Sequence, residues 1–343
     1  MTRKAALAIV VMSAAVSCRR PPPAAHLVER SHQTMGTDVQ VTVSTVDEAR
    51  AGTAIAAVFR EFDRLDAMMS VWRDGSDVLR INAAAGGHPV AVSPETREVL
   101  RIAREVSDET AGTFDVTFGA LSGLWKFDYQ DKDDSVPDPR EIAARLPLIN
   151  YRDVVIDDGA GTVGLRRKGM RINLGGIGKG YAVDRAVDIM RRSGLRDFMI
   201  QAGGDMYVAG RRGDRPWRLG IRDPRGPADR IFAALDLTDG TFSTSGDYER
   251  FFMKDGRRYH HIIDLRTGQP ARLSRSVTLV TDRAVIADAL AKGVFILGPD
   301  AGMALIERTP GIQGVIVGAK NEVSISSGLK NRLILLAPPT DAP

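Results

Sequence analysis

Apolar residues follow two periods along the first third of the chain, and each period predicts a type of element. Valines alternate with polar residues over 39–43, as in a half-buried strand. Apolar residues three and four apart over 47–68 predict a helix with one buried face. A Ser-Pro pair opens a second helical stretch over 93–109, because serine suits the cap and proline suits the first turn.

The rest of the chain alternates short apolar runs with turns. These runs predict strands at 154–156, 163–165, 171–174, 198–201, 206–209 and 217–221. One helix falls between the strands at 171–174 and 198–201, and another, apolar almost all round, covers 283–297. Because hairpins and helices are mixed without a strict βαβ repeat, we expect an α+β fold with a mixed, largely antiparallel sheet and packed helices.

The first 30 residues have the composition of an export signal and a tether. Basic residues at 3–4 precede an apolar stretch over 5–16 that is too short to span a bilayer, and Cys18 follows. This order is typical of a bacterial lipoprotein. We expect a signal peptide over 1–17, acylation of Cys18 and a proline-rich tether over 18–30. An ordinary cleaved signal and an uncleaved anchor are the alternatives.

The remaining residues are interpreted as one domain over 31–335 and a disordered tail over 336–343. A lipid anchor places that domain on the periplasmic face of a bacterial membrane. The single cysteine excludes an internal disulfide and a cysteine-based zinc site. The 47 basic and 43 acidic residues give a formal charge of +4, and most basic residues are scattered arginines. This scatter argues against nucleic acid as a partner.

A glycine-rich turn over 174–184 is the first candidate site. Four glycines and Lys179 follow a predicted strand and open a helix, a geometry that offers backbone N–H groups and a positive charge to an anion. Gly180 and Tyr181 follow the lysine where a P-loop needs Ser or Thr, and the dinucleotide fingerprint needs another glycine spacing. A tight connection without a ligand remains the alternative.

Two of the five histidines stand together, at His260 and His261. The alternation of a strand places them on opposite faces, so that one is solvated while the other points into a site. A histidine pair is more often structural than functional, and both interpretations stay open at this point.

The apolar helix over 283–297 has only two interior charges, Asp288 and Lys292, four residues apart on one face. On a surface helix such a pair contributes about 0.3–0.5 kcal/mol. A helix that is apolar all round is buried, and desolvating two charges there costs far more. We therefore expect Asp288 to face a cation, a phosphate–metal complex or the wall of a hydrated cleft.

Eight short polar or glycine-rich motifs occur in order between about residues 34 and 298. They lie at 35–37, 69–70 with 76–82, 112–117 with Trp125, 174–184, 202–205, 244–248, 261–264 with 267–268, and 287–290. In this order the motifs resemble the ApbE family, the FAD:protein FMN transferases. No single motif is decisive, but eight in sequence are specific.

The resemblance implies an ApbE-like, T-fold-related domain that binds FAD as donor, with Mg²⁺ at the pyrophosphate. It implies transfer of FMN through a phosphoester to a Ser or Thr of another protein, with release of AMP. The acceptor would be a flavin-carrying redox protein or a membrane electron-transfer subunit. This agrees with the residues, because attack on a pyrophosphate needs charge neutralisation and a base.

The resemblance also gives roles to single residues. His261 becomes the base, Lys179 a second catalytic residue, Asp288 a metal carboxylate and Gly178 a metal-binding carbonyl. The implied FAD contacts are Met35, Trp72, Gly112, Thr113, Phe114, Gly175, Lys179, Tyr181, Asp184 and Ile262.

The chain departs from the family pattern in three places. Trp72 stands where the family has a flavin-stacking Tyr, and Leu265 stands where it favours Pro. Lys292 stands where a Thr hydroxyl joins the metal shell, yet a hard cation wants oxygen ligands and an ammonium repels it. Lys292 therefore replaces part of the metal's charge, or leaves the metal to other ligands.

Lys292 also keeps two other functions open. One is a periplasmic lipoprotein that binds or hydrolyses FAD without transferring FMN. The other is a lipid-anchored assembly factor that keeps the fold without catalysis, although the joint presence of His261 and Asp288 argues against it.

Overall fold

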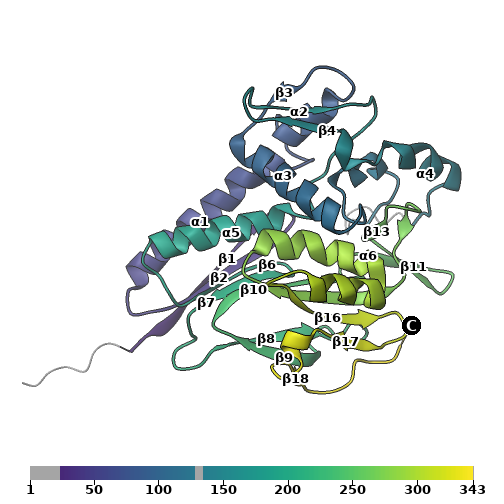
Figure 1. The fold of residues 1–343 in the computed structure, drawn as a ribbon. Helices are drawn as coiled ribbons and strands as arrows, with labels where there is room; N and C mark the ends of the chain where they lie inside the picture. The colour runs from purple at the N-terminus through teal and green to yellow at the C-terminus, as the bar shows by residue number, and fades with distance from the viewer. Residues whose placement is uncertain (1–23, 128–133, 343) are drawn as a thin grey trace, which may run out of the picture.

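Eight antiparallel strands form the central sheet of the described chain, in the order β1-β2-β6-β7-β10-β15-β16-β17 (Figure 1). This computed structural model describes residues 24–127 and 134–342. The strands are β1 His26–Thr34, β2 Thr37–Thr45, β6 Phe198–Ala202, β7 Asp205–Ala209, β10 Asp239–Gly246, β15 Ser274–Thr281, β16 Gln313–Gly318 and β17 Val323–Ile325. The expected α+β class with a largely antiparallel sheet is confirmed.

Helices cover one face of this sheet (Figure 1). They are α1 (Glu48–Met69), α5 (Gly178–Arg192) and α6 (Ala284–Arg308), and α3 (Pro94–Glu109) packs on α6 in turn. The larger core lies between them, and the valines that predicted β2 are fully buried in it. Burial of one face of each element therefore accounts for the apolar periods in the sequence.

A smaller sheet covers the opposite face of the central sheet (Figure 1). It contains β8 (Trp217–Arg222), β9 (Ile231–Leu237) and β18 (Ile334–Leu335), in the order β18-β9-β8. Its apolar side chains form a second core with residues from β7, β10, β15 and β16. The central sheet is thus buried on both faces, which explains the nearly continuous burial along β15.

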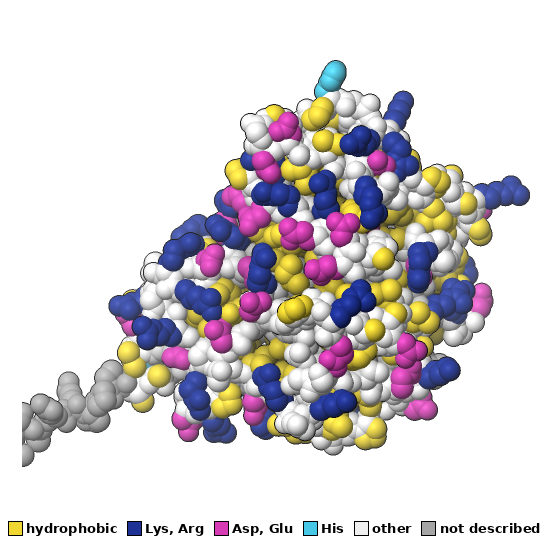
Figure 2. Space-filling model, in the orientation of Figure 1, with side chains coloured by type: hydrophobic (Ala, Val, Ile, Leu, Met, Phe, Trp, Pro, Cys, Tyr) yellow, Lys and Arg dark blue, Asp and Glu magenta, His cyan; other side chains and the backbone are white. Residues whose placement is uncertain are grey.

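The remaining elements lie at the edges of these layers. They are α2 Asp77–Ala83, α4 Pro139–Arg145, β3 Val90–Ala91, β4 Val154–Asp157, β5 Thr162–Leu165, β11 Phe251–Lys254, β12 Arg257–His260, β13 Ile263–Asp264 and β14 Gln269–Pro270. Short 3₁₀ helices occupy Val116–Leu121, Leu146–Leu148, Tyr151–Asp153 and Ser327–Leu329. Figure 2 shows basic and acidic side chains interspersed over the face seen in Figure 1.

The segment 171–174 does not form the strand that its alternation predicted. The Ile172 amide donates to the Asn82 side chain at 2.7 Å, and that side chain donates back to the Ile172 carbonyl at 2.9 Å. The Asn173 amide donates to the carbonyl of Val116 at 2.8 Å. The prediction was wrong because a side chain and a loop carbonyl, rather than a neighbouring strand, satisfy this backbone.

The ordered domain extends beyond both predicted ends. Residues 26–30 form the first part of β1 and pair with β2, so the predicted tether over 18–30 is too long. At the other end, the Thr340 amide and hydroxyl donate to Asp223, at 3.0 and 2.6 Å. The tail predicted to be disordered is therefore bound at Thr340. The predicted signal peptide and Cys18 lie outside the described residues.

The helix predicted over 283–297 is confirmed as the first part of α6. It ends at Gly298, where a positive φ of 82° and the following Pro299 break the helix before a second part continues to Arg308. In the described chain, α6 alone is long and apolar enough to cross a membrane by length and composition. Because most of it is buried under neighbouring elements, we interpret it as a core helix.

Candidate active site

The carboxylate of Asp288 lies fully buried in the first part of α6. Its Oδ2 accepts a hydrogen bond from the Gly180 amide in the first turn of α5, at 2.9 Å. Its Oδ1 pairs with the ammonium of Lys292, which also donates to the Asp288 carbonyl at 2.8 Å. The Lys179 ammonium lies 3.7 Å from the same Oδ1. Burial would raise the pKa of Asp288, but Lys179 and Lys292 outweigh it and hold the pKa below its usual value.

Lys179 connects this carboxylate to a second one. Its Nζ lies 3.0 Å from Oδ2 of Asp205 at the start of β7, and the Ser243 hydroxyl of β10 donates to the other oxygen of Asp205. Burial would lower the pKa of Lys179, but Asp205 and then Asp288 outweigh it and raise the pKa. We call Asp288, Lys179, Lys292 and Asp205 the aspartate–lysine cluster.

Asp205 received no role from the sequence, although it ends the glycine-containing motif 202–205. The structure shows that it is the second counterion of Lys179. The available signal was an aspartate directly after two glycines, at the point where a strand begins. That signal marks a position but does not reveal which lysine comes close to it.

The glycine-rich turn brings α5 close to α6. A Cβ atom on Gly180 would lie 2.3 Å from the carbonyl oxygen of Ala284 and 2.7 Å from Cβ of Asp288, so only glycine fits there. The Gly175 amide donates to the Asn173 side chain at 2.8 Å. Two amides of the predicted anion cradle, at Gly175 and Gly180, therefore have partners inside the protein.

The loop 112–114 packs against the same place. The Thr113 hydroxyl donates to the carbonyl of Gly293, the residue after Lys292, at 3.3 Å. A Cβ atom on Gly176 would lie 3.4 Å from the Phe114 ring and 3.9 Å from the Lys292 side chain. Three predicted motifs, far apart in the sequence, thus meet beside the aspartate–lysine cluster.

His261 follows the end of β12. Its amide donates to the carbonyl of Arg250 at 3.1 Å, and the Arg250 guanidinium donates to the carbonyl of Gly36 at 3.2 Å, next to Met35. Its Nδ1 is buried and has no hydrogen-bond partner in the described chain. Burial, followed by nearby His260 and Lys292, lowers the pKa of His261 to about 3. The ring is therefore neutral over the physiological pH range.

His260 has a structural role. The expectation that one of the two histidines is solvated is wrong, because the His260 ring is buried, Nδ1 of His261 is buried as well, and β12 ends before His261. The His260 ring is buried, and its Nε2 lies 2.8 Å from the Ala271 carbonyl, to which it can only donate. Its Nδ1 then accepts from the Ile262 amide at 3.3 Å. His260 thereby fixes the backbone on both sides of His261.

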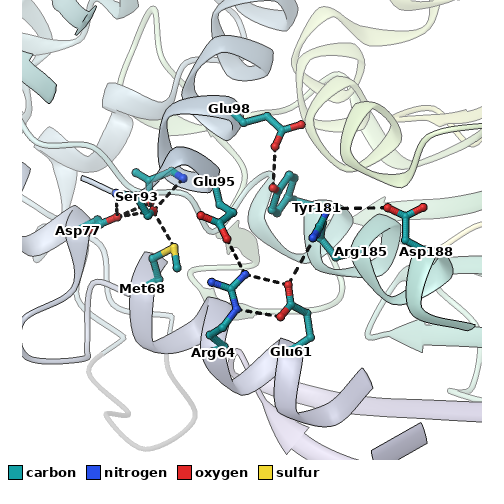
Figure 3. A network of polar contacts seen from close by, with 11 residues as sticks. Glu61, Arg64, Met68, Asp77, Ser93, Glu95, Glu98, Tyr181, Arg185 and Asp188 are labelled. Atoms are coloured by element: carbon teal, nitrogen blue, oxygen red, sulfur yellow. Dashed lines mark hydrogen bonds and ion pairs between the residues drawn. The ribbon is translucent and has the colours of Figure 1, made fainter. Parts of the chain in front are cut away.

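Asp184 and Tyr181 on α5 bind other parts of the protein. The two oxygens of Asp184 accept from the amides of Ala284 and Val285, at 2.7 and 3.1 Å, and so cap α6. Burial raises the pKa of Asp184 to about 6. The Tyr181 hydroxyl donates to Glu98 at 2.8 Å, within the network between α1, α3 and α5 (Figure 3).

Several implied FAD contacts lie on exposed or turn positions. Trp72, in the loop after α1, is 82% exposed. Met35 adopts a positive φ of 51° in the turn between β1 and β2. Ile262 is buried behind His261. Their contacts with FAD stay predictions, as do those of Asp184 and Tyr181.

The ApbE family model matches residues 35–316. The chain is 32% identical over 294 residues to a FAD:protein FMN transferase of Klebsiella pneumoniae, covering 85% of this chain and 90% of the relative. It is 32% identical over 323 residues to that of Treponema pallidum, covering 90% and 89%. Among solved structures, the ApbE protein of Thermotoga maritima superposes with a TM-score of 0.81 at 33% identity, covering 90% and 99%. The flavin transferase ApbE from Vibrio cholerae has a TM-score of 0.80 at 30% identity, with the same coverage.

Proposed function

The chain belongs to the ApbE family, and we propose that it transfers FMN from FAD to a Ser or Thr hydroxyl of a partner protein, with release of AMP. The proposal rests on the ammonium groups of Lys179 and Lys292, which both lie beside the buried carboxylate of Asp288. The charge of Lys292 also contributes to the lowered pKa of His261. This arrangement offers positive charge to a pyrophosphate and a neutral base to a hydroxyl.

The reaction exchanges one phosphorus–oxygen bond for another. The acceptor hydroxyl oxygen attacks the FMN phosphorus of FAD, and the bond from that phosphorus to the bridging oxygen breaks. AMP leaves with the bonding electron pair, and the hydroxyl proton goes to the His261 ring. The low pKa of His261 keeps the ring neutral before FAD binds. The negative charge of bound FAD then raises its proton affinity.

Lys179 and Lys292 provide the positive charge in this proposal. Their side chains are 22% and 20% exposed, so both lysines reach the edge of the protein interior while carboxylates hold their ammonium groups. Asp288 and Asp205 fix both ammonium groups before the substrate arrives. Charge that is already oriented stabilises a developing phosphate charge without reorganisation.

Mg²⁺, which the family resemblance implies, does not fit this arrangement. Both oxygens of Asp288 are bound, one by the Gly180 amide and one by Lys292. The Lys292 ammonium has no lone pair for a metal. No group of three His, Cys, Asp or Glu side chains in the described chain can hold a metal ion. We therefore assign charge neutralisation to the two lysines.

The flavin end of FAD is proposed to lie toward Trp72, Met35 and the loop 112–114. Loop 112–114 contacts the glycine-rich turn and α6, and the Met35 turn is bonded to Arg250, whose carbonyl holds His261. Trp72 has an exposed ring available for stacking. The proposed role of Asp184 and Tyr181 is indirect, since Asp184 binds α5 to α6 and Tyr181 binds α5 to α3.

The acceptor is proposed to be a redox protein or a membrane electron-transfer subunit on the periplasmic side. This part rests on the composition of residues 1–30, with acylation of Cys18 as the anchor. Globomycin treatment of expressing cells, followed by mass spectrometry of the mature N-terminus, tests it. An unacylated N-terminus in untreated cells contradicts the anchor.

The transfer itself is tested with the mature domain, FAD and a flavin-acceptor protein domain. Flavin fluorescence that stays on the acceptor in a denaturing gel, with one AMP per label, is the expected result. His261→Ala should abolish labelling while FAD binding persists, because the base is lost and the binding site is not. Labelling by His261→Ala at the wild-type rate would remove His261 as the base.

A second candidate function is FAD hydrolysis without transfer, and Lys292 is the observation that favours it. In that case the same assay yields AMP and free FMN in equal amounts, without a labelled acceptor. If FAD binds and no product of either kind forms, both proposals fail.

A further inference from the structure

A cavity of about 270 Å³ lies behind His260, and no member of the aspartate–lysine cluster lines it. Its walls carry five arginines from four parts of the chain: Arg225, Arg257, Arg258, Arg272 and Arg275. Asp247, at the end of β10, is the one acidic residue in the lining. We call this the arginine cavity.

Two of the five arginines have hydrogen-bonded partners of their own, and Arg257 lies over the Tyr259 ring, 4.7 Å from its centroid. Arg225 forms a bidentate pair with Asp247, at 2.7 Å for each of its two bonds. Arg275 donates to the carbonyl of Ala319 at 3.2 Å and to the side chain of Asn321 at 3.0 Å. The carboxylate of Asp341 lies 3.9 Å from Arg275. Asp247 is thus paired with Arg225, and Asp341 lies beside Arg275.

Arg258 differs from these two. Its guanidinium lies over the Phe251 ring, 3.9 Å from the centroid, and its buried Nε and Nη1 have no hydrogen-bond partner in the described chain. The Ser274 hydroxyl, on a residue that is only 3% exposed, and Nε of Arg225 also lack partners there. Buried polar groups in folded proteins are nearly always bonded, so unpaired donors around one cavity indicate an absent partner.

The electrostatics support the same conclusion. Burial, followed by the charge of Arg225, lowers the pKa of Arg258 and of Arg275. A guanidinium loses proton affinity where positive charge exceeds negative charge. With five arginines and one aspartate in its lining, the cavity carries a net positive charge and attracts anions.

We propose that the arginine cavity is an oxyanion-binding site that takes one carboxylate or phosphate group. Arginine donates in a planar fork that matches both groups, and the Ser274 hydroxyl adds a further donor. The cavity is too small for FAD and has room for one oxyanion with a few waters. Arg258 is the main ligand, because its Nε and Nη1 have no other partner in the described chain.

The site is coupled to His261 through the backbone. His260 lines the cavity, and its ring is bonded to Ala271, which also lines it, and to the Ile262 amide. An occupant therefore contacts the segment that positions His261. This placement suits an acidic side chain of the acceptor protein, and it equally admits a free anion held beside the site.

Thermal unfolding with sodium sulfate tests the site without FAD or acceptor. At constant ionic strength, set with sodium chloride, sulfate should raise the Tm of the wild-type protein in a saturable manner. Arg258→Gln should lose this response. Arg218→Gln, which changes an exposed arginine on β8, should keep it. No saturable rise in the wild type, or an equal rise in Arg258→Gln, overturns the proposal.

A second variant covers the case in which Arg258→Gln does not fold. Ser274→Ala removes one donor with little change in volume, and sulfate should bind about tenfold more weakly, as expected when one hydrogen bond to an anion is lost. Unchanged sulfate affinity in Ser274→Ala then overturns the proposal.

Transfer kinetics distinguish the two sources of the oxyanion, and this step rests on the proposed function. If an acceptor carboxylate occupies the cavity, sulfate competes with the acceptor, and Arg258→Gln raises the acceptor KM about tenfold while the KM for FAD is unchanged. If a free anion occupies it, sulfate does not compete and the acceptor KM stays the same. A protein without transfer activity still gives the thermal result, so failure of the site and failure of the function are separable.

Discussion

Asp184, which is partly buried, and Asp288, which is fully buried, perform the same structural task in opposite directions. Asp184 on α5 accepts from the first amides of α6, and Asp288 on α6 accepts from the Gly180 amide in the first turn of α5. Each helix thereby satisfies the backbone of the other. Their electrostatics differ, since the pKa of Asp184 is raised to about 6 while that of Asp288 is lowered.

The difference comes from the lysines. Burial dominates at Asp184, where the capped amides offset only part of it. At Asp288 the charges of Lys179 and Lys292 outweigh burial. At Asp184 the charge of Arg283 is too weak to offset burial, so this carboxylate serves as a helix cap. In the proposed mechanism, Asp288 with its two ammonium groups orients charge for a phosphate. The comparison predicts that loss of Asp288 impairs catalysis and loss of Asp184 impairs stability.

The largest effect is expected from Asp288→Asn. The amide can still accept from Gly180, but the two lysines lose their common counterion and their orientation. We expect kcat/KM for FMN transfer to fall about 10³-fold, the range seen when an oriented charge is lost. Gel fluorescence over time measures this. Asp184→Asn is the matched control and should stay within about tenfold of wild type. An equal loss of kcat/KM in Asp288→Asn and Asp184→Asn would contradict the different roles of the two carboxylates.

Lys292→Thr is the next test, because it replaces an ammonium by the hydroxyl typical of the family. Wild-type activity should be the same in EDTA and in Mg²⁺, since Lys292 supplies the charge. The variant should lose about 10²-fold in EDTA and recover in Mg²⁺, which can then bind Asp288. Lys292→Met is the control, because it offers neither charge nor oxygen and should not recover. Loss of wild-type activity in EDTA contradicts the proposed role of Lys292.

Asp184 is expected to make stability depend on pH. Its pKa is about 6 in the folded protein against an ordinary 3.8, so the folded state holds the proton more tightly. The stabilisation from this proton is complete below pH 3.8 and is lost as pH rises through about 6. It amounts to about 3 kcal/mol at most.

Urea unfolding of wild type and Asp184→Asn at several pH values checks this. The free energy of unfolding of wild type, relative to the variant, should decrease between pH 4 and pH 7. Subtracting the free energy of the variant from that of wild type cancels the contribution of the other carboxylates, because both proteins contain them. A difference that stays constant with pH would mean that folding does not raise the pKa of Asp184.

The sequence predicted the elements better than the contacts. The periods of apolar residues predicted α1, α3 and the first part of α6, because burial of one face determines them. They failed at 171–174, where the partners of the backbone are an Asn82 side chain and a loop carbonyl. Such partners depend on the tertiary structure and leave no period in the sequence.

The site was predictable in the same uneven way. Asp288 and Lys292 were linked by their spacing on one helix, and the structure pairs them. Asp205 meets Lys179 across two elements, so no spacing could connect them. The second ammonium at Asp288, from Lys179, and the capping of α6 by Asp184 likewise depend on contacts between separate elements. Residue types and spacing predict local pairs, whereas charge balance needs the fold.

The smallest expected effect comes from Trp72, which differs from Asp184 in its exposure. Both are implied FAD contacts, but Asp184 holds a helix while the Trp72 ring is 82% exposed. Trp72→Ala should therefore leave the unfolding midpoint unchanged, because little apolar area is buried at this position. Affinity for FAD should fall up to about tenfold, in line with about 0.5–1.5 kcal/mol for an aromatic stacking pair.

Fluorescence titration with FAD measures the affinity, and Trp72→Tyr is the matched control that restores the aromatic common in the family. The tyrosine variant should bind FAD within about threefold of wild type, since stacking requires a ring face rather than an indole. If Trp72→Ala binds FAD as wild type does, the flavin lies elsewhere, and the contact implied by resemblance is wrong. If Trp72→Ala also has a lower unfolding midpoint, the exposed ring has a structural role, as Asp184 has.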